Sequence, residues 1–199
     1  GDPQFVIVGL PDAAVRESQH RVSTAIVNCG YEPFVGRVTV NLAPADIRKE
    51  GPLFDLPIAM GILVASGAID MEGAPVRRRP GQPPPRPRHP MDLATVAMIG
   101  ELSLAGEVRR VRGVLPIAIK MREIGVRKFL VPEENAAEAA MVEGLEVYPV
   151  RSLTQAVQLV TGEDELTQPR SVSLEDLYAS HATSGPDFVE VKGQEMAKR

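Results

Sequence analysis

The chain has 199 residues, of which 44% are hydrophobic and 24% charged, with a formal net charge of −4. This composition is typical of an ordinary globular protein. The negative balance excludes a surface that binds polyanions everywhere, although a local basic patch stays possible. The single cysteine, Cys29, excludes an internal disulfide and a cysteine-cluster metal site. No apolar run reaches the ~18 residues of a membrane span, so we predict no membrane segment and a cytoplasmic protein.

The first forty residues predict a strand, a helix and a second strand. Phe5–Val8 and Arg37–Leu42 are rich in the β-branched and aromatic residues of strands. Asp12 is a good N-cap for a helix over Ala13–Cys29, which Gly30 ends. Its apolar face comprises Val15, Val22, Ile26 and Cys29. We expect Arg16 and Arg21 on the surface, with Glu17 paired to Arg21 one turn away.

A polar loop and a very apolar helix follow the second strand. Arg48, Lys49 and Glu50 precede Gly51, and we expect this loop to be exposed and to contact either phosphate, a neighbouring subunit or only solvent. The helix from Leu56 to about Ser66 is apolar nearly all round, which predicts burial on most sides. Asp55 stands at its start, where a carboxylate can cap free N–H groups and oppose the helix dipole.

The segment 74–90 interrupts the pattern with seven prolines and five arginines. Such a segment forms neither a helix nor a ladder, so we predict a solvated and disordered insertion. It could act as a nucleic-acid arm, but it lacks the interleaved aromatic residues that stack on bases. A tolerated surface insertion is therefore the preferred interpretation.

The second half alternates strands and helices. Met98–Leu104 and Glu107–Val111 predict a hairpin turning at Ala105–Gly106. Helices are expected at Val114–Ile124, Asn135–Met141 with Asn135 as cap, and Ser152–Val160; strands are expected at Lys128–Pro132 and Glu146–Val150. Parallel βαβ units plus a hairpin predict an α/β (α+β) domain with a mixed sheet over residues 1–162. Residues 163–186 are polar and predict a linker.

Three segments are specific enough to indicate a family: Phe5–Ser18, Val40–Leu63 with its NLAPAD, KEG and DLPIA runs, and Gly100–Gly113. They resemble the N-terminal domain of ComM-type proteins, also called magnesium-chelatase-like AAA+ ATPases. Residues 187–199 resemble the start of that family's ATPase module. The resemblance implies a Lon-protease-like fold and a parent that forms a homo-oligomeric, hexameric ring. It also implies a DNA branch-migration helicase for recombination in natural transformation, whereas chelatase activity need not follow.

The same resemblance places a degenerate catalytic dyad in the chain. Lon-type peptidases use a serine and a lysine, and the matching positions here are Asp55 and Leu115. A carboxylate is a poor nucleophile for an amide, and a leucine has no proton to exchange. Lys120, about one turn beyond Leu115, is expected to face solvent. We therefore predict a catalytically inactive accessory domain.

Other functions remain open at this point. Arg109, Arg110 and Arg112 lie near the hairpin end, where they could follow a DNA backbone or form a plain charged rim. The domain could also bind peptides in a dead protease groove, belong to a magnesium-chelatase-type ATPase, or use Ser103 as a displaced nucleophile. The chain has no G-x-x-x-x-G-K-[ST] loop. ATP and magnesium are accordingly expected only in the full-length parent, bound by the AAA+ module that this domain would contact.

Overall fold

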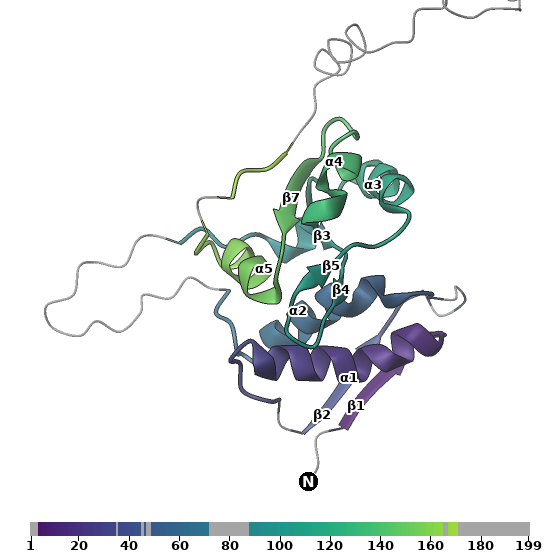
Figure 1. The fold of residues 1–199 in the computed structure, drawn as a ribbon, viewed down its shortest axis with the longest axis vertical. Coiled ribbons are helices and arrows are strands. Elements are labelled where there is room, and N and C mark those ends of the chain that lie inside the picture. The colour runs from purple at the N-terminus through teal and green to yellow at the C-terminus, as the bar shows by residue number, and fades with distance from the viewer. Residues whose placement is uncertain are drawn as a thin grey trace, which may run out of the picture.

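The computed structural model describes residues 4–34, 36–44, 46, 49–71, 88–164 and 167–170. Its lower part in Figure 1 is a two-stranded parallel sheet of β1 (Gln4–Val8) and β2 (Arg37–Asn41), with α1 (Ala13–Asn28) joining the strands. The pairing runs in register from Gln4 opposite Arg37 to Val8 opposite Asn41. Helix α2 (Asp55–Ala65) packs beside α1. The predicted strand–helix–strand unit is confirmed.

Local capping residues explain why α1 forms where it does. The Asp12 carboxylate accepts a hydrogen bond from the Val15 N–H at 2.7 Å, as its N-cap role predicts. Gly30 follows the C-cap with a φ of +86°, which favours glycine. Its buried face comprises Val15, Ser18, Val22, Ala25 and Ile26. Cys29 is only partly buried at the end of that face.

The upper part is a three-stranded parallel sheet with the strand order β3–β6–β7. These strands are β3 (Val96–Met98), β6 (Lys128–Pro132) and β7 (Glu146–Val150), and the helices around them are α3 (Val114–Glu123), α4 (Ala136–Ala139) and α5 (Leu153–Val160). The Ser152 hydroxyl caps α5 by accepting from the Gln155 N–H at 3.1 Å, as predicted. Short 3₁₀ turns occupy 52–54, 93–95 and 133–135. The mixed α/β fold is confirmed.

A small antiparallel hairpin joins the two parts. It pairs β4 (Glu101–Leu102) with β5 (Val108–Arg109), so the predicted hairpin is present but shorter. The predicted single strand 98–104 is wrong, because the chain changes partner at Gly100. There the Gly100 carbonyl accepts from the Leu56 N–H at 3.0 Å, and a Cβ on Gly100 would lie 2.6 Å from the Val108 side chain. A side chain at position 100 would therefore overlap Val108 of β5, whereas its contact with Leu56 of α2, at 3.6 Å, would be an ordinary one.

The predicted helix over 135–141 is also corrected. The structure has a 3₁₀ turn at Glu133–Asn135 followed by the short α4, and the Asn135 side chain caps neither. Instead the buried Asn135 amide accepts from the Val111 N–H and donates to the Val111 carbonyl, each at 3.0 Å. The Asn135 amide thereby satisfies the backbone N–H and C=O of Val111, just after the hairpin. These two hydrogen bonds explain why Asn135 can be buried.

The core consists of two hydrophobic clusters, one around α1, α2 and α5 and the other around α3, α4 and the inner strands. Two residues of the predicted linker contact the body, and the predicted boundary at 162 stays a prediction. Arg88 pairs with Glu163 at 2.8 Å, and Arg170 forms an antiparallel bridge with Val147. Most of the predicted insertion 74–90 and linker 163–186, and all of 187–199, lie outside the described residues.

Candidate functional site

Asp55 opens α2 with its side chain fully buried, at 0% exposure. One carboxylate oxygen accepts from the Ser18 hydroxyl, and the other accepts from the backbone N–H of Leu102 at 3.1 Å. Arg21 donates to both oxygens, from Nε at 2.8 Å and from Nη2 at 3.2 Å. A carboxylate is tolerated in a protein interior when its oxygens are paired in this way.

Arg21 and Ser18 come from α1, so the cluster joins α1, α2 and β4. The hydrogen bond to Asp55 raises the pKa of Arg21 above its ordinary value, against the lowering effect of burial. Arg21 also donates to the Ala14 carbonyl at 3.0 Å. The predicted pair with Glu17 is present at 3.5 Å, but the prediction that Arg21 is a surface residue is wrong.

Two features of the sequence indicate that α1 needs a polar partner, but they do not identify that partner as Asp55. Ser18 interrupts the apolar face of α1 between Val15 and Val22, and Arg21 lies one turn beyond it. A hydroxyl on a buried face requires a polar partner, and a guanidinium beside it suggests an anionic one from elsewhere in the chain. The predicted capping role of Asp55 is corrected accordingly: among the described residues, its carboxylate accepts from α1 and β4 and not from its own helix.

Leu115 lies in a different environment. It is partly buried in α3, where its N–H donates to the Glu138 side chain at 3.1 Å and its side chain packs against the second cluster. Leu53, two residues before Asp55, packs against that same cluster. No contact described here brings Asp55 and Leu115 together, and their assignment as a lost dyad remains a prediction.

The other nucleophile and amine considered from the sequence are also engaged. Ser103 is buried in the hairpin turn, where its hydroxyl oxygen accepts from the Glu107 N–H at 3.0 Å. Lys120 is exposed on α3, as predicted, and pairs with Glu123 at 3.0 Å. Ser103 has a structural role in closing the turn.

Lys49 is buried, although the sequence predicted an exposed loop residue. Its side chain is only 7% exposed, its ammonium donates to the Pro44 carbonyl, and its backbone bridges to Pro11. This loop is therefore held against the start of α1, and the expectation of an exposed Lys49 is wrong. Arg48 lies outside the described residues.

The hairpin arginines share their surface with acids. Arg109 and Arg110 are exposed along a groove that also contains Glu101, Glu107, Glu133, Glu134 and Arg151. Glu133 pairs with Arg151, whose hydrogen bond is the main cause that lowers the pKa of Glu133. Arg112 is exposed and outside this groove. A DNA backbone would meet glutamates beside the arginines here, which weakens a phosphate site.

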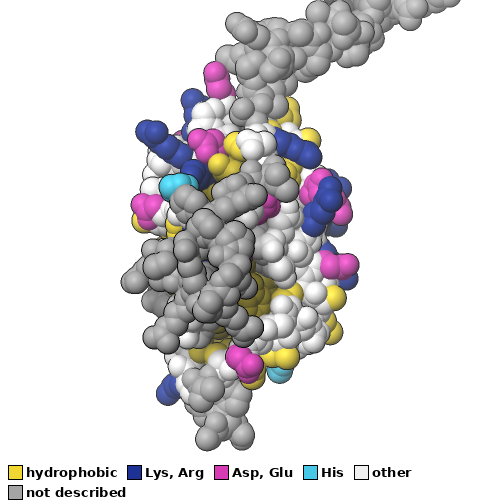
Figure 2. Space-filling view, turned by 90° about the vertical axis from the view of Figure 1, so that its left-hand side faces the viewer, with side chains coloured by type: hydrophobic (Ala, Val, Ile, Leu, Met, Phe, Trp, Pro, Cys, Tyr) yellow, Lys and Arg dark blue, Asp and Glu magenta, His cyan; other side chains and the backbone are white. Residues whose placement is uncertain are grey.

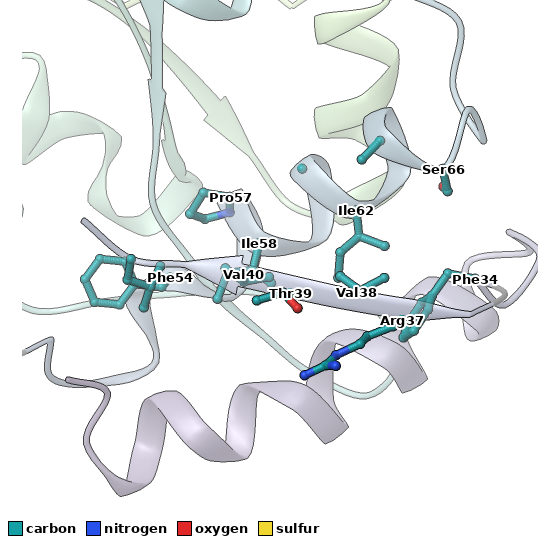
Figure 3. A pocket seen from close by; sticks show the side chains of 13 residues that line it. Phe34, Arg37, Val38, Thr39, Val40, Phe54, Pro57, Ile58, Ile62 and Ser66 are labelled. Carbon is teal, nitrogen blue, oxygen red and sulfur yellow. The ribbon is translucent and has the colours of Figure 1, made fainter. Parts of the chain in front are cut away.

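A separate apolar cavity of about 590 Å³ lies between β2 and α2. Val38, Val40, Ile58 and Ile62 are among the residues that line it, and Figure 3 shows these side chains between the strand and the helix. Figure 2 shows the side of the molecule that lies on the left in Figure 1. Hydrophobic atoms are exposed around a hollow in the lower half of this view. The sequence reasoning did not locate this cavity, because it depends on how α2 sits beside the strand edge.

Comparison with known proteins identifies the group to which this chain is related. A family model described as subunit ChlI of Mg-chelatase matches residues 1–76 and 87–135. The chain belongs to this family. The competence protein ComM of Haemophilus influenzae is 35% identical over 199 residues, which are the whole of this chain and 35% of that protein. YifB of Escherichia coli is 32% identical over the same length, 34% of its own.

A more distant similarity supports the expected fold. Lon protease 2 of Bacillus subtilis is 26% identical over 141 residues, covering 70% of this chain and 22% of the protease. The chain thus spans about a third of the length of ComM and YifB and matches their N-terminal region. Within the described part of the chain, no helix is both long and apolar enough to cross a bilayer.

Proposed function

We propose that this chain is the accessory domain of a ComM-type AAA+ ATPase, and that it supports assembly of the ATPase ring without hydrolysing peptides. The observation that carries the proposal is the burial of Asp55 in the Ser18–Arg21 cluster. A group at that position serves to join α1, α2 and β4, and it is closed to any substrate. Membership of the family and the match to ComM support the placement beside an ATPase module.

The parent's activity as a branch-migration helicase is part of the same proposal. The charge distribution favours a scaffold over a DNA-binding surface, because glutamates accompany Arg109 and Arg110 in their groove. ATP and magnesium are proposed for the parent alone. This chain has no phosphate-binding G-x-x-x-x-G-K-[ST] loop, and its described residues hold no group of three metal-ligating side chains.

The test uses a full-length parent that contains this domain. Deleting residues 1–162 is expected to leave ATP hydrolysis measurable while reducing ring formation in mass photometry and branch migration of a four-way junction. A deletion variant that assembles rings and migrates junctions like the intact protein contradicts the proposal.

A DNA-guiding role is tested separately through salt dependence. Binding of branched DNA to the domain, measured at two salt concentrations, falls steeply with salt if phosphates are contacted. R109E/R110E is the informative variant, and K120E/R122E on α3, which reverses the same number of charges outside the groove, is its matched control. We expect the two variants to behave alike. A selective loss with R109E/R110E would instead assign the hairpin to DNA.

A peptide-binding module is the second candidate function, and the apolar cavity beside β2 is the observation that favours it. Binding of an unfolded polypeptide, compared with branched DNA under the same conditions, separates it from the first. Affinity for peptides that persists at high salt supports this candidate, since apolar contacts are not screened.

A further inference from the structure

Strand β2 has an open edge within the described part of the chain. Its sheet contains β1 and β2 alone, so one edge of β2 pairs with β1 and the other faces the apolar cavity. The backbone N–H and C=O groups along an open edge are ready to pair with another strand. Unlike many edges, this one carries neither a lysine nor a proline over Arg37–Asn41.

The side chains of β2 define two faces for an incoming strand. Val38 and Val40 are partly buried toward the helices, whereas Arg37, Thr39 and Asn41 are exposed. Figure 3 shows Arg37 extending to the side of β2 opposite Pro57 and Ile62. A strand added at this edge would alternate in the same way, with every second side chain directed toward α2.

The α2 wall of the cavity has room for those side chains. Gly61 and Ala65 are exposed there, and a Cβ built on Gly61 meets no atom within 4 Å. At the far end Phe34 closes the cavity, held edge-to-face against Phe5 with ring centroids 5.9 Å apart. The cavity is therefore closed by an aromatic ring at one end and open at the glycine, which suits medium-sized aliphatic side chains.

Charge adds a further requirement on the occupant. Arg37 lines the cavity and makes no ion pair among the described residues. Opposite charges on directly facing residues of neighbouring strands stabilise their pairing. An incoming strand with a carboxylate opposite Arg37 satisfies this guanidinium on the face of β2 turned away from α2, while its alternate aliphatic residues enter the cavity.

We propose that the groove between β2 and α2 binds an extended polypeptide strand from a partner protein, with alternating aliphatic residues and one acidic residue placed opposite Arg37. Backbone pairing with the β2 edge supplies affinity, and the cavity and Arg37 select the sequence. This inference rests on the second candidate function, peptide binding, and specifies its occupant. It stands apart from the proposed ring role, since it concerns a surface distinct from the Asp55 cluster and the hairpin.

The test uses the whole chain and a fluorescein-labelled peptide in which Val alternates with Thr and one Thr is replaced by Glu. Fluorescence anisotropy is expected to show saturable binding. Replacing the peptide's Glu with Gln, or Arg37 with Gln, is expected to weaken binding about two- to five-fold, and the two changes together no further. The amides of β2 are expected to gain protection from hydrogen exchange on binding.

Gly61→Leu is the decisive variant, because it fills the cavity from a helical position with free space. Leucine is a better helix former than glycine, so this change is not expected to unfold α2. We expect it to weaken peptide binding at least about tenfold, while thermal stability is retained. Thr154→Leu is the control, because it adds a leucine at an exposed helical position of α5 outside the groove.

Three outcomes overturn the inference. The first is absence of saturable binding, and the second is binding that Gly61→Leu leaves unchanged. The third is self-association of the chain that Gly61→Leu abolishes, since the groove would then belong to a second copy. Ring assembly and junction migration in the parent report on the proposed function alone, so failure there is distinguishable.

Discussion

Removing the Asp55 carboxylate should strongly destabilise the fold. Asp55→Ala leaves the Arg21 guanidinium, the Ser18 hydroxyl and the Leu102 N–H without their shared acceptor. Breaking a buried pair by deleting one partner costs about 3–5 kcal/mol, against a total stability of about 5–15 kcal/mol for a domain. Urea unfolding should therefore show a loss of at least about a fifth of the free energy of unfolding, even for a domain at the stable end of that range.

A matched variant on the same arginine provides the control. Glu17 pairs with Arg21 from an exposed position, at 73% side-chain exposure, and Glu17→Ala should cost only about 0.3–0.5 kcal/mol. Replacing both members of the buried pair, as in D55L/R21M, should recover much of the loss, because no charge is then left alone. If Asp55→Ala cost as little as Glu17→Ala, the role assigned to the cluster would be wrong.

Two further predictions concern the hairpin turn and β7. Gly106→Ala should lower the melting temperature of the protein more than Gly125→Ala does. Both glycines have a positive φ (+83° and +87°), but only a Cβ at position 106 would overlap the Cys29 sulfur. Equal losses of melting temperature in the two variants would contradict this contact. Burial, then the hydrogen bond to Glu146, raises the pKa of Tyr148 to about 12. Because the folded state holds the phenol proton more tightly, Tyr148 adds to the free energy of unfolding below pH ~10. This contribution is lost as pH rises through about 12. Tyr148→Phe should therefore make the free energy of unfolding fall less steeply at alkaline pH.

The parts of the fold that depend on nearby residues were predictable. Asp12 and Ser152 cap their helices because a side-chain oxygen lies three residues before the N–H that it accepts. The parallel strand–helix–strand units follow from the alternation of short apolar runs with amphipathic segments. These signals lie within one or two turns of the chain, so the sequence contains them in full.

The parts that depend on distant residues were not predictable. Arg21 and Asp55 are 34 positions apart, and periodicity on α1 alone assigns Arg21 to the surface. Asn135 looks like a helix cap in the sequence, yet it pairs with the backbone of Val111, 24 positions earlier. Tertiary partners decided both cases, because a buried polar group takes whichever partner the packing provides.

Restoring a serine and a lysine provides a final test of the dyad assignment. In D55S/L115K the new hydroxyl would lie where the side chain is 0% exposed, enclosed by α1 and β4. We therefore expect no labelling by a serine-reactive phosphonate. The matched variant is L53S/L115K, whose serine stands at a partly buried position in the 3₁₀ turn before α2 and leaves the Asp55 carboxylate in place. If either variant is labelled, we expect it to be this one, because position 53 is the less enclosed of the two. Labelling of D55S/L115K alone would show that position 55 opens to substrate, and the structural role of its carboxylate would have to be abandoned.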